Sequence, residues 1–142
     1  MKSKKANSYH HLIKAAQQAK QHSYSPYSHF RVGAALLTQS GKIIHGCNVE
    51  NSSFGLTICA ERNALFKAIS EGLKKFKAIA ISTDAEEFTS PCGACRQVLM
   101  ELAGDIDVIL TNKSGRSKVV TTGDLLPYPF DQANLEQGQR KK

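Results

Sequence analysis

The sequence contains no apolar run long enough to cross a membrane. A membrane-spanning helix needs about 18 consecutive apolar residues, and no segment approaches that length. The lysine-rich N-terminal segment is also not followed by the apolar stretch that a secretory signal peptide requires. These two absences exclude a membrane-spanning protein and predict a cytoplasmic one that has no membrane partner.

Cysteine is scarce, with four residues in a chain of 142. Without a secretion signal, so few cysteines are more often reduced thiols or metal ligands than a disulfide framework. The chain length and a hydrophobic fraction of 41% fit one globular domain with its own core and leave no room for two. We therefore predict a single domain, residues 1–142, with polar tails at about 1–7 and 131–142.

The formal net charge of +7 is not arranged as a nucleic-acid-binding surface. Much of it lies in the two tails, where charged residues are usually just solvated. The interior has no basic stripe interleaved with aromatic residues, which is the pattern that binds single strands. Four lysines between residues 67 and 77 form a loose cluster, so nucleic-acid binding is the less favoured alternative. We expect no nucleic-acid partner.

Helical and strand-like patterns of apolar residues alternate along the chain. The short segment 112–116 can join only antiparallel neighbours, because a parallel crossover needs a dozen or more residues. The order of elements predicts an α/β fold: a three-layer α/β/α domain on a five-stranded mixed sheet, with a turn at 124–130 and an unstructured tail after it. The predicted helices cover 8–21, 59–72 and 92–104, and the predicted strands cover 30–38, 41–49, 76–83, 106–111 and 117–122.

The stretch SPCGACRQV places Cys92 and Cys95 three positions apart at the start of a predicted helix. Side chains at that spacing lie on one helix face and can bind one ion. Cys59 begins another predicted helix, where unpaired backbone N–H groups and the helix dipole favour a thiolate. Cys47 lies within a predicted strand, and we interpret it as a buried structural thiol. Three thiolates leave the fourth position of a tetrahedral zinc site open, as in catalytic sites.

A carboxylate, Glu61, lies two positions after Cys59. Two residues along a regular helix are about 200° apart, so these two side chains can converge only if Cys59 is the N-cap residue. Helix starts opposite the carboxyl ends of central strands lie at the rim where open α/β sheets bind ligands. The sequence therefore predicts a metal site with an adjacent carboxylate at this rim.

Five short motifs follow one another along the chain: PYSHFRVGAAL at 26–36, GCNVEN at 46–51, CAER at 59–62, PCGAC at 91–95 and LLPYPF at 125–130. CAER followed some thirty residues later by PCGAC resembles the signature of the zinc-dependent nucleobase deaminases. Within that superfamily, the ordered set of five resembles the cytidine deaminase family. The similarity extends from about Ser8 to Phe130, and a set in this order is highly specific.

This resemblance implies the reaction and the cofactor. The implied reaction is hydrolytic deamination of cytidine and deoxycytidine to uridine and deoxyuridine with release of ammonia, a step of pyrimidine salvage. One zinc ion per chain would be bound by Cys59, Cys92 and Cys95, and a zinc-bound hydroxide would attack the base while Glu61 shuttles protons. Family members of this length are usually homotetramers. Relatives often carry tyrosine and proline at 54–55, so the subunit contacts of Phe54 and Gly55 would differ.

The resemblance also assigns residues around the substrate. Asn48 and Glu50 would bind the ribose hydroxyls, and the backbone around Ala60 would meet the base. Phe30 would flank the nucleoside, together with Phe130 from a neighbouring subunit.

Three thiolates on Zn²⁺ leave a formal charge of −1, which lowers the Lewis acidity of the ion. The resemblance implies that Arg62 offsets this charge by donating hydrogen bonds to the ligand sulfurs. Arg96, which follows the C-x-x-C pair, is a second candidate for that role and could equally be a surface ion-pair residue.

Other interpretations compete with this one. PCGAC alone also fits a thioredoxin-like redox pair, but that leaves the third cysteine and its acidic neighbour unexplained. A structural zinc would need Cys47 or His45 as a fourth ligand. An enzyme acting on a cytosine-containing antibiotic such as blasticidin S would share the zinc signature, but the segment NVEN suits a plain ribose.

Overall fold

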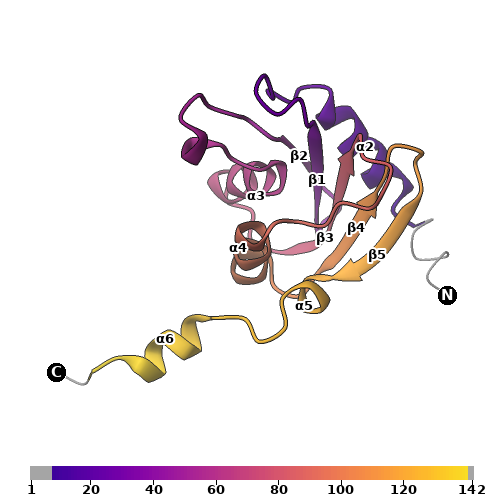
Figure 1. The fold of residues 1–142 in the computed structure, drawn as a ribbon. Helices are drawn as coiled ribbons and strands as arrows, with labels where there is room; N and C mark the ends of the chain where they lie inside the picture. The colour runs from indigo at the N-terminus through magenta and orange to yellow at the C-terminus, as the bar shows by residue number, and fades with distance from the viewer. Residues whose placement is uncertain (1–7, 141–142) are drawn as a thin grey trace.

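The computed structural model describes residues 8–140, in which a five-stranded sheet carries helices on both faces (Figure 1). None of the described helices is long and apolar enough to cross a membrane. The tail predicted for residues 1–7 lies outside the described residues. The elements are α2 (His10–Lys20), β1 (Val32–Thr38), β2 (Ile43–Cys47), the 3₁₀ turn η1 (Phe54–Leu56), α3 (Ala60–Ser70), β3 (Phe76–Thr83), α4 (Gly93–Ala103), β4 (Asp107–Thr111), β5 (Ser117–Thr121), α5 (Thr122–Leu125) and α6 (Gln132–Gly138).

The strand directions confirm the predicted mixed sheet, whose order is β2-β1-β3-β4-β5. β1 pairs antiparallel with β2 and β3, β3 pairs parallel with β4, and β4 pairs antiparallel with β5. β3 lies at the centre, and Lys77 is its one residue that is not buried. A strand covered on both faces reads as a nearly continuous apolar run, which is the pattern of FKAIAIST.

Two apolar cores, one on each face of the sheet, produce the three predicted layers. Alternation along a strand sends successive side chains to opposite faces, so Ala34 and Ile79 lie in one core while Ala35 and Ala80 lie in the other. α3 and α4 cover the first core. α2 covers the second with a stripe of apolar side chains: Leu12, Ala15, Ala16 and Ala19.

Two glycines allow helices to lie directly on the sheet next to the site. A Cβ atom at Gly33 would be 2.2 Å from the backbone oxygen of Ala16 in α2, and one at Gly46 would be 2.5 Å from the backbone oxygen of Ala60 in α3. Both distances are well inside van der Waals contact, which is optimal at about 3.5–4.0 Å. Gly46 therefore determines how closely the first turn of α3 approaches β2.

The C-terminal segment differs from the prediction of a turn and an unstructured tail. α5 and α6 each form a short helix, and each begins with a reciprocal capping box, Thr121 with Asp124 and Asp131 with Asn134. α6 has no buried residue and extends away from the body (Figure 1). The polar composition of the tail agrees with its exposure to solvent. The capping hydrogen bonds stabilise a helix there even though none of its residues is buried.

Candidate active site

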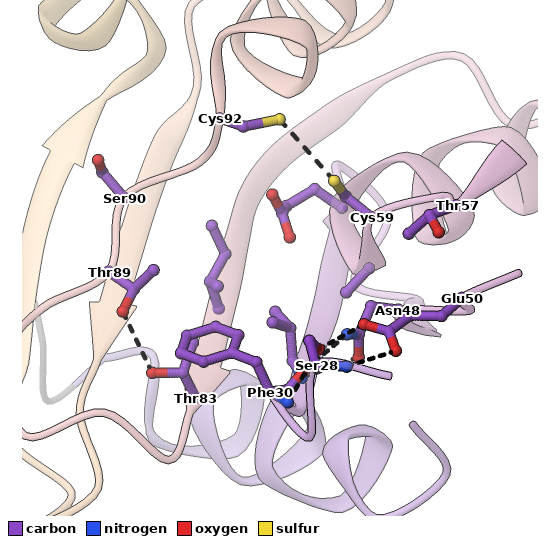
Figure 2. Close-up of a pocket in the computed structure, with 14 residues that line it drawn as sticks. Ser28, Phe30, Asn48, Glu50, Thr57, Cys59, Thr83, Thr89, Ser90 and Cys92 are labelled. Atoms are coloured by element: carbon purple, nitrogen blue, oxygen red, sulfur yellow. Dashed lines mark hydrogen bonds between the residues drawn. The ribbon is translucent and has the colours of Figure 1, made fainter. Parts of the chain in front are cut away.

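A cavity of about 320 Å³ opens at the carboxyl end of β3, beside the first turns of α3 and α4. Figure 2 shows Cys59 and Cys92 at one end of it and Ser28, Phe30 and Glu50 at the other. We call these the cysteine end, made of Cys59, Glu61, Cys92 and Cys95, and the loop end, made of Ser28, Phe30, Asn48 and Glu50. The position is the rim at which the sequence predicts a site.

Three cysteine thiols converge at the cysteine end. Cys59 and Cys92 are the N-cap residues of α3 and α4, and Cys95 lies in the first turn of α4. The three Sγ atoms lie within 4.8 Å of one another, and those of Cys59 and Cys92 are 3.8 Å apart. A tetrahedral zinc with Zn–S bonds of about 2.3 Å would hold two sulfurs about 3.8 Å apart. The cluster therefore fits one zinc ion per chain and leaves one coordination position open.

Neighbouring groups stabilise the thiolate form of one of the three cysteines, and a cation would be needed to stabilise the other two as thiolates. A hydrogen bond from Cys95, with help from Arg62 and Cys92, lowers the pKa of Cys59 to about 5 against the opposing effect of burial. The same bond, together with burial, raises the pKa of Cys95. A terminal nitrogen of Arg62 donates a hydrogen bond to the Cys59 sulfur at 3.5 Å. Further thiolates would need a positive charge inside the cluster, and a bound divalent metal supplies one.

Glu61 lies in the first turn of α3 and is only 4% exposed. Burial, and then the negative charge of Cys59, raise the pKa of its carboxyl group. Glu61 lines the cavity together with Cys59 and Ala60. Cys59 has the extended backbone of an N-cap residue, with ψ of 155°, which is the geometry that convergence of the pair requires. A buried carboxyl group with a raised pKa suits proton transfer nearer neutral pH.

Glu50 is held at the loop end by the segment that precedes β1. Its Oε1 atom accepts hydrogen bonds from the backbone N–H groups of Tyr27 at 2.9 Å and Ser28 at 3.1 Å. Its Oε2 atom accepts a hydrogen bond from the Ser28 hydroxyl. That hydroxyl is the main cause that lowers the pKa of Glu50, so the carboxylate is a fixed negative charge on the cavity wall.

Asn48 also lines the cavity, but its side chain is occupied by other parts of the protein. Its Nδ2 atom donates to the backbone oxygen of Phe30 at 2.7 Å, and its Oδ1 atom accepts from the backbone N–H of Val32 at 2.9 Å and from the Ser23 hydroxyl. Asn48 is 8% exposed. It therefore fixes the position of Phe30 in addition to lying at the predicted binding surface.

Phe130 lies outside the cavity of its own chain. It precedes α6, is 61% exposed, and its backbone oxygen accepts a hydrogen bond from Gln97 at 2.8 Å. The prediction places Phe130 at the cavity of a neighbouring subunit, and within the described chain Phe30 is the phenylalanine that lines the cavity.

Arg96, the second candidate for offsetting the charge of the sulfurs, directs its hydrogen bonds to other groups. Its three donor groups bind the Pro91 backbone oxygen at 2.7 Å, the Leu125 backbone oxygen at 2.9 Å and the Ser90 hydroxyl at 2.8 Å. These bonds fasten the loop that leads to Cys92 to the end of α5. Arg96 therefore holds the backbone that leads to Cys92 in place.

Cys47 is half-buried rather than buried, because it is the last residue of β2. Its thiol donates to the His22 backbone oxygen at 3.4 Å, and partial burial raises its pKa. Among the described residues, the cluster of three cysteines does not include it.

Sequence reasoning missed several polar residues that line the cavity: Ser28, Thr57, Thr83, Thr89 and Ser90. Thr83 is the last residue of β3, and its hydroxyl lies 3.4 Å from that of Thr89 (Figure 2). A polar residue that ends a buried apolar strand marks the rim of the sheet, and this signal was present in the sequence. Arg31, which directly precedes β1, binds Asp84 at 2.8 Å and does not line the cavity.

Comparison with known proteins identifies relatives along most of the chain. The family model described as the cytidine and deoxycytidylate deaminase zinc-binding region matches residues 6–111. A cytidine deaminase of Sporosarcina psychrophila is 50% identical over 125 residues, which are 87% of this chain and 92% of the relative. A probable cytidine deaminase of Dictyostelium discoideum is 51% identical over 134 residues, which are 91% of this chain and 90% of the relative.

Solved structures show the same likeness in three dimensions. The 1.6 Å crystal structure of cytidine deaminase from Burkholderia pseudomallei superposes with a TM-score of 0.84 at 51% identity, covering 86% of this chain and 98% of that one. The crystal structure of cytidine deaminase from Mycobacterium tuberculosis gives a TM-score of 0.75 at 39% identity, covering 86% and 96%. Fold, cysteine cluster and family model agree: the chain belongs to the cytidine and deoxycytidylate deaminase family.

Proposed function

We propose that the protein catalyses the hydrolytic deamination of cytidine and deoxycytidine to uridine and deoxyuridine, with release of ammonia. The observation that carries the proposal is the meeting of three cysteine thiols and a buried glutamate at one end of a cavity. The names of the relatives, which are 50% and 51% identical along most of the chain, support the same reaction.

Cys59, Cys92 and Cys95 would hold a zinc ion, which would supply Lewis acidity to the reaction. Glu61 lies on the same cavity wall and provides the proton transfers. It takes a proton from the water that attacks C4 of the cytosine and delivers it to ring atom N3. It then takes the remaining proton of the added hydroxyl and passes it to the amine, so that the C4–N bond breaks, ammonia leaves and a carbonyl remains at C4. Positioned proton transfer of this kind contributes roughly 10²–10⁴-fold to a rate, and the raised pKa of Glu61 suits a group that must both bind and release a proton.

The remaining site residues adjust the charge on the thiolates and position the substrate. Arg62 donates to the Cys59 sulfur at 3.5 Å and withdraws charge from the thiolates. The backbone at Ala60 meets the base, Phe30 flanks it, and Glu50 accepts a hydrogen bond from a ribose hydroxyl. The roles of Glu50 and Phe30 are supported by their place on the cavity wall opposite the cysteines.

The cavity favours a nucleoside over a nucleotide, although the family name covers both. Among the described residues that line it there is no lysine and no arginine, and the carboxyl groups of Glu50 and Glu61 both face it. A 5′-phosphate would lose its hydration without gaining a cationic partner. The free nucleoside is therefore the proposed substrate, which suits a step of pyrimidine salvage in the cytoplasm.

We further propose a homotetramer in which Phe130 completes the cavity of a neighbouring subunit. Support comes from large apolar side chains that are exposed in the single chain, namely Phe54 at 73%, Leu56 at 64% and Phe130 at 61%. Size-exclusion chromatography with light scattering measures the assembly directly. A monomer at working concentration that deaminates cytidine at full rate would contradict this part of the proposal.

The decisive experiment adds cytidine to the purified protein and follows the loss of its long-wavelength absorbance. Chromatography should identify uridine, and an ammonia assay should give one equivalent per uridine. The Glu61→Gln protein is the matched control for contaminating activity. Zinc-loaded protein that leaves both cytidine and deoxycytidine unchanged would refute the proposed function.

A further inference from the structure

The segment from Tyr24 to Phe30 lies beside the chain that carries Glu50. The backbone N–H of Tyr24 donates to the Asn48 oxygen at 3.0 Å, and that of Glu50 donates to the Tyr24 oxygen at 2.8 Å. These bonds surround a parallel bridge between Tyr24 and Val49. The backbones of the two segments are thus joined independently of the Glu50 side chain.

A tight turn then brings the segment back onto the carboxylate. The backbone N–H of His29 donates to the Ser25 oxygen at 3.0 Å, and His29 has φ of 56°, in the left-handed region that few non-glycine residues adopt. In this turn the backbone N–H of Phe30 donates a hydrogen bond to the Ser28 hydroxyl oxygen at 3.0 Å.

The Ser28 hydroxyl connects Phe30 to Glu50. A serine hydroxyl has one hydrogen to donate and can accept two hydrogen bonds. It accepts from the Phe30 N–H, so its own hydrogen is directed to Glu50 Oε2. The carboxylate at the loop end and the backbone of the aromatic residue beside it are therefore held by one side chain.

The hydrogen bonds that the Glu50 carboxylate already accepts show how many of its acceptor sites remain for a ligand. An ionised carboxylate has about four acceptor sites. The two backbone N–H groups of Tyr27 and Ser28 and the Ser28 hydroxyl occupy three of them. Glu50 lines the cavity, so the remaining site is available to a donor bound there, such as a sugar hydroxyl.

We infer that Ser28 is a positioning residue for sugar recognition: it fixes the Glu50 carboxylate so that one acceptor site faces the nucleoside. This inference rests on the proposed function, because it assumes that the sugar of a nucleoside meets Glu50. Ser28 itself need not touch the substrate.

The test compares Ser28→Ala with wild-type protein on two substrates. On cytidine, we expect KM to rise about tenfold, the effect of losing one hydrogen bond to a charged group, while kcat stays within about twofold because the cysteine end is untouched. On 2′,3′-dideoxycytidine, which lacks both secondary hydroxyls, Ser28→Ala should leave kcat/KM unchanged. Ser28→Thr keeps the hydroxyl at an exposed position and should restore KM on cytidine.

Ser25→Ala is the matched control, since the Ser25 hydroxyl contacts Ser23 and not Glu50. It should leave the kinetics on both substrates unchanged. An unchanged KM for Ser28→Ala on cytidine would overturn the inference. An equal loss on cytidine and on its dideoxy analogue would also overturn it, because that result indicates a general distortion of the loop.

Failure of the proposed function would be recognised separately, since wild-type protein would then deaminate neither nucleoside. The Ser28–Glu50 contact can still be judged by amide hydrogen exchange of the segment 22–31. Ser28→Ala and Glu50→Gln should both speed exchange there, whereas Ser25→Ala should not. Unchanged exchange in both variants would refute the positioning role without any activity measurement.

Discussion

The two ends of the cavity are built in different ways. At the cysteine end, every functional side chain belongs to an N-cap or the first turn of α3 or α4, so helix geometry sets its position. At the loop end, Glu50 and Phe30 lie on irregular segments whose positions depend on hydrogen bonds from side chains such as Ser28 and Asn48. Substitutions at the cysteine end should therefore abolish a function, whereas those at the loop end should give graded losses of affinity.

The largest effect is expected from removal of one sulfur. Cys95→Ser should lose zinc and all measurable activity, because a hydroxyl does not replace the thiolate of this buried ligand. A zinc ion held by Cys59, Cys92 and Cys95 would join the starts of α3 and α4, so the variant should also unfold at a lower temperature. Zinc content by atomic absorption, with about one ion per chain in wild-type protein, and a thermal melt give the two readouts.

Cys47→Ser is the matched control, since Cys47 lies outside the cysteine cluster. It should retain one zinc per chain and normal turnover. Loss of zinc in this variant alone would contradict the assignment of three thiolate ligands.

The next largest effect is expected at Glu61. Glu61→Gln should retain zinc and fold but lose at least ~10²-fold in kcat, because an amide cannot transfer protons as a carboxyl group does. Burial raises the pKa of Glu61, so the neutral amide should be well tolerated and the variant should melt no earlier than wild-type protein. Near-normal turnover by the zinc-loaded variant would show that another group carries the protons.

The loop end can be probed with a substrate instead of a substitution. Cytidine 5′-monophosphate should be poorer than cytidine by at least ~10²-fold in kcat/KM, at about 1.4 kcal/mol per factor of ten. The described residues of the cavity wall include no lysine or arginine, and Arg31 is paired with Asp84 at 2.8 Å. Equal turnover of the two substrates, measured side by side, would show that the pocket accepts nucleotides.

The difference between the cysteine end and the loop end also explains which features could be predicted from the sequence. Cys92 and Cys95 lie at one helix start, where spacing along the chain determines direction in space, so that pair was predictable. Cys59 begins a different helix, and the sheet brings its sulfur to the other two. The role of Ser28 depends on the turn at His29, which has φ of 56°. No pattern of apolar residues indicates such a turn.

Two features that differ from the expectation have physical causes as well. Arg96 binds the backbone oxygen of Leu125, 29 positions away, and a contact over that separation is set by the tertiary fold. The tail after residue 130 was predicted from its polarity, but Asp131 and Asn134 form a capping box that begins α6. That spacing was readable in the sequence, whereas the target of Arg96 was not.

The smallest effect is expected at the ion pairs of Asp84, which lie outside the cavity lining. Asp84, which follows β3, binds Lys20 and Arg31, each at 2.8 Å, and Arg31 directly follows Phe30. The hydrogen bond from Arg31, with help from Lys20, lowers the pKa of Asp84. Its side chain is 39% exposed, so solvent screens the pair and Asp84→Asn should reduce the free energy of unfolding by no more than about 1 kcal/mol.

The pH dependence of that loss has a defined sign. Because folding lowers the pKa of Asp84, its stabilising effect is present above the unfolded value of about 3.9 and is lost as pH falls through the lower folded value. The difference in urea midpoint between wild-type and Asp84→Asn proteins should therefore be constant near neutral pH, shrink in acid and shrink in high salt. Glu86→Gln, which removes an ion pair to Lys113 whose side chains are 62% and 75% exposed, should change the midpoint less. A difference for Asp84→Asn that grows as pH falls would show that Asp84 does not stabilise the fold as a charged group.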